Sequence, residues 1–295
     1  MQLMNSENKF FPIFVLTFLA IIWGSSFILI KKGLDVYSPD QVGTIRIVFA
    51  FFVMLPIALK HVRTIFKTHW KIILPFGLIA NLIPALLFAL AETGLGSSVT
   101  GILNSLTPIF TLIIGALFFS TGIQKSQIAG LVIGFIGSLT LSFIGSSGNL
   151  GEFNYYALFV VAATICYGLS GNMVRKFFLE INSVILTSLA MFSVGPISLI
   201  YLLTTDFTYT LFNIDGAWLS LFYLFLLGAV GTAFALILFN RVIQTTSAVF
   251  ASTVTYLIPI AAVIWGLIDN EALYPLHFVG MALIILGVFV VNKNK

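Results

Sequence analysis

The sequence contains few charged residues and a single cysteine. Charged side chains make up 8% of its 295 residues, whereas an ordinary soluble domain carries about 25%. So few charges leave little to cover a water-facing surface, which argues against a soluble globular protein. The single cysteine excludes an internal disulfide and any cysteine-based metal cage. We therefore expect no cofactor and no metal site.

The sequence contains long apolar runs with few charged residues. Hydrophobic residues make up 59% of the chain and include 30 phenylalanines. Apolar runs of about 17 to 25 residues can cross a bilayer as helices. No connection between the runs could house a soluble domain, so we predict one all-α integral membrane unit. The ten predicted transmembrane helices are Phe10–Ile30, Val42–Leu59, Ile72–Ala91, Val99–Phe119, Ile128–Ile144, Tyr155–Val174, Val184–Leu203, Trp218–Phe239, Ala248–Ile268 and Leu276–Val291.

Lysine and arginine are distributed unequally between the two sides of the predicted helices. Eleven of the 14 basic residues, Lys9, Lys293 and Lys295 among them, fall on the side that carries the N-terminus. Cytoplasmic loops carry such an excess, so we expect a multi-pass protein of the cell (inner) membrane with both termini cytoplasmic. The net charge of +4 then needs no nucleic-acid partner, because the basic residues form no stripe with aromatic side chains.

The chain contains an internal repeat. The stretches FALAETGLGSSVTGILNSLTP (88–108) and FNRVIQTTSAVFASTVTYLIP (239–259) align without a gap, and their phenylalanines and prolines coincide. We therefore predict two repeats, residues 10–144 and residues 155–291, of five helices each. Because five is odd, the second repeat enters the membrane from the opposite side. Two inverted five-helix repeats are typical of secondary transporters.

A G-x-S-G string, GLSG at residues 168–171, is similar to the nucleophile region of an intramembrane serine protease. A serine nucleophile needs a base within hydrogen-bond reach. Two of the three histidines lie in a loop on the N-terminal side, and His277 opens the last helix on the other side, far from Ser170. Ser170 also matches Ser26 in the first repeat. We interpret the string as small residues that let helices pack closely, and we do not expect an enzyme.

Two prolines at matching positions indicate where a substrate could bind. Pro108 and Pro259 lie near the middle of the fourth and ninth helices, and each frees the backbone carbonyl four residues earlier. Those carbonyls belong to Asn104 and Thr255. Freed backbone groups at membrane depth are tolerated where protein or a water-filled cavity satisfies them. We therefore predict a substrate site at the level of Asn104 and Thr255.

Five further residues are candidates for this site. Asn81 lies beside a helix-kinking proline, and it could donate and accept hydrogen bonds together with Tyr256. Trp23 and Tyr167 could form aromatic walls, although buried aromatic rings are more often core. Arg46, one turn into the second helix, could attract an anionic group or extend outwards to the membrane surface.

Two observations limit the predicted mechanism. The threonines of the fourth helix, Thr100, Thr107 and Thr111, can satisfy their hydroxyls on carbonyls of their own helix, and we favour that interpretation. No aspartate or glutamate lies at the centre of a predicted helix. Glu92 lies at the end of the third helix, near the outer surface of the membrane. This pattern argues against a proton-coupled antiporter built around a buried carboxylate.

Several motifs resemble one known group of membrane proteins. They are IIWGSSFILIKKGL, TIRIVFAFF, VTGILNSLTPIFTLIIGALFF and VFASTVTYLIPIAAVIWGLI. Together they resemble EamA-type members of the drug/metabolite transporter superfamily over nearly the whole chain. The resemblance implies export or exchange of small polar metabolites, often amino acids or related compounds. It also implies a central cavity formed by helices one to four and six to nine, with helices five and ten at the periphery.

We therefore predict a secondary transporter that exports a small polar metabolite, such as an amino acid, across the cytoplasmic membrane by alternating access. Its expected partners are the small-molecule substrate and the lipid bilayer, and it would act as a monomer or homodimer without nucleic acid. One alternative is a polytopic membrane enzyme, such as an acyl- or phosphotransferase, although no cluster of acid, base or metal ligands is visible. The other alternative is a non-transporting membrane scaffold, which an internal cavity would disfavour.

Overall fold

The computed structural model describes residues 10–121, 125–144, 151 and 153–292, and every regular element in these ranges is helical. Lys9, Lys293 and Lys295, which contribute to the charge count above, lie outside the described residues. The α-helices are α1 (Phe10–Leu34), α2 (Pro39–His61), α3 (Lys67–Gly77), α4 (Ile83–Ala91), α5 (Ser97–Leu103), α6 (Thr107–Phe118), α7 (Lys125–Ser142), α8 (Tyr156–Phe177), α9 (Ser183–Thr204), α10 (Phe207–Asn213), α11 (Ala217–Leu226), α12 (Ala235–Thr245), α13 (Ala248–Ser252), α14 (Ile258–Ile268) and α15 (Pro275–Asn292).

Seven helical stretches in the described ranges are long and apolar enough to cross a membrane. One of them, Pro39–Ala91, has 53 residues, which is too long for a single crossing. Gly43 near its beginning lies against Ala85 and Leu86 near its end, so this stretch folds back and supplies two crossings. The shorter apolar helices Ile128–Ser142 and Pro275–Gly287 complete the predicted ten, and the all-α membrane fold is confirmed.

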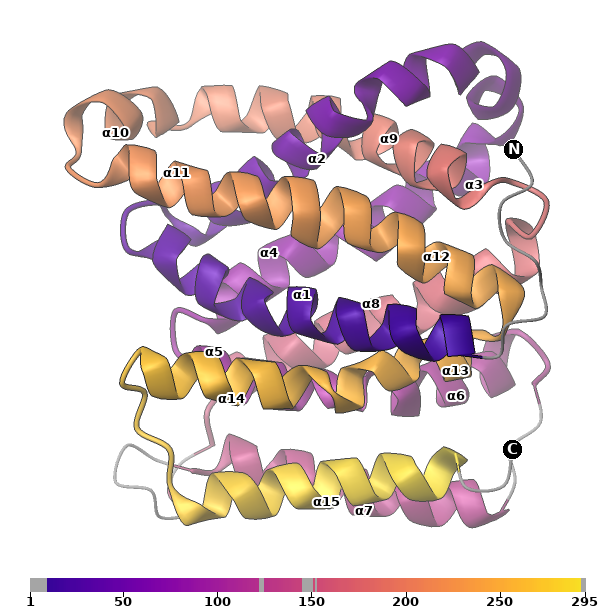
Figure 1. Cartoon of the computed structure of the whole chain (residues 1–295), viewed down its shortest axis with the longest axis vertical. Coiled ribbons are helices and arrows are strands. Elements are labelled where there is room, and N and C mark those ends of the chain that lie inside the picture. The colour runs from indigo at the N-terminus through magenta and orange to yellow at the C-terminus, as the bar shows by residue number, and fades with distance from the viewer. Residues whose placement is uncertain (1–9, 122–124, 145–150, 152, 293–295) are drawn as a thin grey trace.

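The helices lie side by side, and α1 begins at the same end of the bundle at which α15 ends (Figure 1). We call this the terminal end and the other the opposite end. The first helix of the first repeat, α1, begins at the terminal end, whereas the first helix of the second repeat, α8, begins at the opposite end (Figure 1). The two five-helix repeats are therefore inverted.

The fifth and tenth helices, α7 and α15, pack along each other at one edge of the bundle (Figure 1). A Cβ atom added to Gly137 would lie 2.8 Å from the backbone oxygen of Gly280. The missing side chains let the two backbones approach closely, as in other membrane helix pairs. This pair is peripheral, as the family resemblance implies.

Matching helices of the two repeats are broken at matching places. The fourth helix is interrupted by a 3₁₀ turn at Asn104–Leu106 between α5 and α6. The ninth is interrupted by a 3₁₀ turn at Thr253–Tyr256 between α13 and α14. In each case a proline follows at the second residue of the next helix, because a proline ring cannot continue the hydrogen-bond ladder of the preceding turn.

The third and eighth helices carry wider, π-helical segments. Leu78–Leu82 separates α3 from α4, and the amide of Ile83 bonds the carbonyl of Leu78, five residues earlier. Leu227–Phe234 separates α11 from α12. Single π-helical turns often mark functional sites, and these two again occupy equivalent positions in the repeats.

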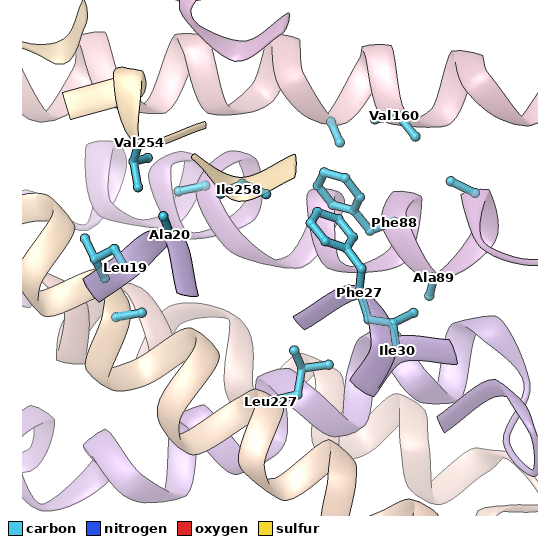
Figure 2. Close-up of a cluster of buried hydrophobic side chains, with 14 of the residues drawn as sticks. Leu19, Ala20, Phe27, Ile30, Phe88, Ala89, Val160, Leu227, Val254 and Ile258 are labelled. Carbon is cyan, nitrogen blue, oxygen red and sulfur yellow. The ribbon is translucent and has the colours of Figure 1, made fainter. Parts of the chain in front are cut away.

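The main hydrophobic core surrounds α1. Figure 2 shows Phe27 of α1 facing Phe88 of α4, and the two ring centroids are 5.7 Å apart in an edge-to-face arrangement. Leu227 from the π-helical segment and Ile258 from α14 belong to the same buried cluster. The first helix is thus held between elements of both repeats, and this fixes the side chains that α1 presents to the interior.

The apolar runs do not predict the short helix α10. Its seven residues, Phe207–Asn213, lie at the opposite end between α9 and α11 (Figure 1). Tyr209 and Phe212 on this helix are exposed. Seven residues are too few to give a run of membrane-spanning length, which explains why the hydrophobic pattern missed it.

Candidate functional site

A cavity with both polar and apolar walls lies in the interior, between the two repeats. Its volume of about 90 Å³ is enough for several water molecules. Aromatic rings form part of its wall, and both repeats contribute hydrogen-bonding side chains. The polar and charged residues that line it are Ser26, Arg46, Asn81, Asn104, Thr107, Thr111, Ser170, Thr187, Thr232, Asn240, Ser252 and Thr255.

The irregular helical segments supply the central polar groups. Asn81 and Thr232 come from the π-helical segments of the third and eighth helices. Asn104 and Thr255 come from the 3₁₀ turns of the fourth and ninth helices. Four broken helices, in two symmetry-related pairs, therefore converge on one cavity, which is how transporter sites near the bilayer midplane are commonly built.

The structure brings six of the seven predicted site residues to this cavity. They are Trp23, Arg46, Asn81, Asn104, Tyr167 and Thr255. Tyr256 is not among the lining residues; it is partly buried and packs against the hydrophobic core. That these residues bind a substrate remains a prediction.

The two carbonyls freed by the prolines already have partners within the protein. The hydroxyl of Thr107 donates to the carbonyl oxygen of Asn104 at 2.8 Å. The hydroxyl of Ser105 donates to the carbonyl oxygen of Thr255 at 2.6 Å. The second bond joins the two broken helices where their 3₁₀ turns meet. The carbonyls are therefore less available to a substrate than the prolines suggested.

The threonine hydroxyls of the fourth helix bond carbonyls of their own helix. Thr100 donates to Gly96 at 3.0 Å and Thr111 donates to the carbonyl of Thr107 at 2.8 Å. The interpretation favoured from the sequence is confirmed for both. Of the two, Thr111 lines the cavity, and its hydroxyl can still accept a hydrogen bond there.

Arg46 points into the protein rather than to the membrane surface. Its side chain is 8% exposed, and its Nε donates to the hydroxyl of Thr232 at 3.0 Å. No described residue places a carboxylate oxygen within 4.0 Å of the guanidinium. A buried, unpaired positive charge is costly, and Arg46 carries such a charge at the cavity wall.

Aromatic residues fix the shape of the cavity wall. The indole N–H of Trp23 donates to the carbonyl of Gly231 at 2.9 Å, which ties α1 to the π-helical segment of the eighth helix. The rings of Trp23 and Phe239 meet edge to face, with centroids 4.9 Å apart. Tyr167 stacks on Phe88 at 5.8 Å. These contacts link both repeats around the cavity.

Four charged side chains at the opposite end form a cluster that the sequence did not predict. The Lys31 ammonium lies 2.7 Å from the Asp269 carboxylate and 3.0 Å from the Glu271 carboxylate. Lys32 lies 2.6 Å from Asp269. These four residues, which we call the ion-pair lock, connect the end of α1 to the loop between α14 and α15.

Glu271 also holds the beginning of α5. Its carboxylate accepts hydrogen bonds from the backbone amides of Ser97 and Ser98 at 2.8 and 3.0 Å. Burial alone would raise the pKa of the Glu271 carboxyl, but hydrogen bonds from Ser98, Lys31 and Ser97 outweigh it and lower the pKa to about 2. The contribution of Glu271 to the lock is therefore present above its ordinary pKa of about 4.3 and is lost as the pH falls towards 2.

The cavity lining reaches towards both ends of the bundle. At the opposite end it includes Phe88, three residues before the end of α4, and Ile30, which directly precedes Lys31 of the lock. At the terminal end it includes Val174 and Ile243, each within one turn of the end of its helix, and Ala248, the first residue of α13. The lock therefore lies next to the cavity, on the side of the opposite end.

Ser170 is part of a helix contact. Its hydroxyl donates to the carbonyl of Tyr167 at 3.0 Å. A Cβ atom on Gly168 would lie 2.8 Å from the backbone of Phe110, so α8 packs directly on the backbone of α6. The packing interpretation of the G-x-S-G string agrees with both contacts.

The effects of substitutions at Gly168 and Ser170 on the stability of the protein can be compared. We expect Gly168→Val to destabilise the protein by roughly 1–3 kcal/mol, because the added side chain would force α8 away from α6. Ser170→Ala should cost under about 1 kcal/mol, because a single hydrogen bond inside a membrane protein contributes little. Thermal unfolding in detergent would compare the two. A large loss of function in a normally stable Ser170→Ala protein would contradict the packing role.

An all-helical membrane bundle with two inverted repeats and a cavity between them is an architecture found in many membrane transporters. The model of the EamA-like transporter family matches residues 10–143 and again residues 154–293. The chain therefore belongs to the EamA-like transporter family.

Known proteins give the same general picture. An uncharacterized inner membrane transporter of Escherichia coli K12, YedA, is 23% identical over 98% of this chain and 93% of its own length. An S-adenosylmethionine/S-adenosylhomocysteine transporter of Chlamydia trachomatis serovar D is 24% identical over 93% of this chain and 87% of its own. A solved structure, described only as the crystal structure of a protein, has a TM-score of 0.64 at 14% identity over 95% of this chain and 96% of its own, and shows the shared fold.

Proposed function

We propose that this protein exports a small zwitterionic metabolite, an amino acid or a compound that contains one, by alternating access across the cytoplasmic membrane. The observation that carries the proposal is Arg46, a guanidinium at the cavity wall without a carboxylate partner among the described residues. Guanidinium groups bind carboxylates with paired, charge-assisted hydrogen bonds. A substrate carboxylate would supply the partner that Arg46 lacks.

Other groups on the cavity wall can bind the amino group of such a substrate. The side-chain oxygen of Asn81 is buried and has no hydrogen-bond partner among the described residues. It can accept a hydrogen bond from an ammonium or amide group. Asn104 adds a second amide on the facing broken helix, and Trp23 and Tyr167 offer flat apolar surfaces. The name of the Chlamydia relative, whose substrates contain an amino-acid group, is consistent with this chemistry.

Alternating access is supported by the inverted repeats and by the ion-pair lock. The cavity lining reaches towards the terminal end at Val174 and Ile243, and the lock joins α1 to the α14–α15 loop at the opposite end. The excess of basic residues on the side of the termini favours a cytoplasmic terminal end. A cavity that approaches the cytoplasm is the state in which an exporter takes up its substrate.

The first test is a metabolite profile. We would overexpress the protein in a bacterial host and measure compounds in the medium by mass spectrometry, with Asn104→Leu as the inactive variant. Asn104 is 6% exposed and lines the cavity, and its side-chain oxygen accepts one hydrogen bond, from the Thr107 hydroxyl at 3.3 Å, so the change removes an amide that can also bond a substrate. A carboxylate-containing compound should accumulate with the wild type and fall to the background level with Asn104→Leu.

The matched control is Asn213→Leu, which removes an exposed amide at the end of α10. It should export as the wild type does. If Asn104→Leu inserts normally and exports as well as the control, the cavity is not the substrate path. If no compound differs between the wild type and an empty host, export of a host metabolite is wrong.

A further inference from the structure

Glu92 is a buried carboxyl group without a hydrogen-bond partner. It follows the last residue of α4 and is 9% exposed. Both carboxylate oxygens are buried, and no described residue donates a hydrogen bond to either of them. The sequence placed Glu92 at the end of the third helix, near the outer surface of the membrane, and did not predict its burial. The α4–α5 connection instead packs against the loop that carries Glu271. The Glu271 carboxylate lies next to Gly96, which belongs to that connection.

Three charged groups on other elements act on Glu92 electrostatically. They are Lys31 at the end of α1, Arg46 on α2, and Glu271 in the loop between α14 and α15. Neither cation comes within ion-pair distance of Glu92. Lys31 belongs to the ion-pair lock and Arg46 lines the cavity, so Glu92 lies between the lock and the cavity.

An ionised carboxylate in this position would be buried without compensation. Such a group takes up a proton instead, because a neutral carboxyl loses far less hydration when it is buried. Burial, with a smaller contribution from the negative charge of Glu271, raises the pKa of the Glu92 carboxyl well above its usual range, against the opposing effect of Lys31 and Arg46. Glu92 is therefore neutral while the lock is closed.

We propose that Glu92 is a proton-binding site, which holds a proton while the ion-pair lock is closed and releases it to water when the lock opens. The step is a simple dissociation of the carboxylic acid: the proton passes to water entering from the opposite end, and a solvated carboxylate remains. This inference rests on the alternating access of the proposed function, since it requires the lock to open.

The sign of the pH effect follows from this arrangement. The closed state binds the proton more tightly, so a rise in pH shifts the protein towards the open lock, from about pH 4.3 up to the raised pKa of Glu92. The hydrogen bonds from Lys31 and Lys32 lower the pKa of Asp269, and that of Glu271 is about 2. Both lock carboxylates therefore stay ionised above pH 5 and add no change of their own.

The experiment measures the width of the opposite end directly. In a Cys166→Ser background, spin labels at Asp35→Cys and Ala272→Cys, two exposed loop positions on either side of the lock, report the distance between α1 and the α14–α15 loop by pulsed electron resonance. In the wild type we expect the long-distance population to grow at least threefold between pH 5 and pH 9. Glu92→Gln, which imitates the protonated group, should keep the short distance throughout.

Two control variants should retain the wild-type response to pH. Glu180→Gln removes an exposed carboxylate at the terminal end. His277→Gln removes the imidazole of α15, which lies with Glu271 in the same surface hollow; histidine is the control of choice because an unperturbed imidazole changes charge between pH 5 and 8. Loss of the response in His277→Gln but not in Glu92→Gln would overturn the assignment.

A lock variant separates failure of this inference from failure of alternating access. Glu271→Ala should lengthen the distance at every pH. If it does so and Glu92→Gln still responds to pH as the wild type does, Glu92 is not the proton site and this inference alone is wrong. If even Glu271→Ala leaves the distance short, the opposite end does not open, and alternating access falls together with the proton site.

Discussion

Replacing Arg46 with methionine is expected to abolish export and, at the same time, to raise thermal stability. The guanidinium is buried and has only the Thr232 hydroxyl as its hydrogen-bond partner among the described residues. Methionine has a similar length and no charge, so it removes the desolvation cost of the cation. The substrate carboxylate then enters a cavity without its counter-charge. Removal of one partner of a buried charge pair costs about 2–5 kcal/mol, which corresponds to at least ~30-fold weaker binding.

A loss of export together with a gain in thermal stability would distinguish a substrate-binding role of Arg46 from a structural role. Unfolding in detergent would measure the stability, and the metabolite profile would measure export. Arg241→Met provides the control, because Arg241 is an exposed arginine near the terminal end of α12 and should change neither quantity. A lower melting temperature for Arg46→Met would indicate that the guanidinium is structural, and unchanged export would remove it from the substrate path.

Glu271→Ala is expected to open the opposite end of the protein. The substitution removes the ion pair with Lys31 and also leaves the backbone amides of Ser97 and Ser98 without their acceptor. An unmade hydrogen bond of a buried donor costs about 1–3 kcal/mol, so the closed state loses several contributions at once. The closed state is then no longer lower in free energy than the open state.

Thiol labelling would measure the opening from one side of the membrane. A Cys166→Ser protein with Ser26→Cys carries its thiol on the cavity wall. At pH 6, a bulky, impermeant reagent applied at the opposite end should modify the Glu271→Ala variant at least ~10-fold faster than its parent, which is a shift of about 1.4 kcal/mol. Glu271→Gln removes the charge but retains one oxygen acceptor, which can serve one of the two amides, and its rate should fall between the two. Equal rates for all three would show that the lock does not control access.

The sequence predicts those parts of the site that depend on neighbouring residues in the chain. Apolar runs reveal the helices, and the prolines at 108 and 259 reveal where the fourth and ninth helices break. Because the repeat places these breaks at equivalent positions, Asn104 and Thr255 could be assigned to one level before their contacts were known. Asn81 followed from its neighbouring Pro84 in the same way.

Residues defined by long-range packing escaped prediction. Lys31 and Glu271 are 240 positions apart, and nothing in either neighbourhood indicates that they meet. Thr232 was missed because it lies in an apolar run without a proline, and a π-helical segment leaves no regular sequence signal. Glu92 was placed at the surface because its burial depends on the path of a loop from the other repeat.

The hydrogen bond between Ser105 and the carbonyl of Thr255 has an electrical consequence. It holds the two broken helices together where their 3₁₀ turns meet. If the proposed alternating access is a rigid tilt of these helices about that contact, one end narrows as the other widens and no continuous water path forms. A cell could then make this transporter in quantity without short-circuiting its membrane potential. Ser105→Gly, which releases that contact, is the change that would admit an ion leak.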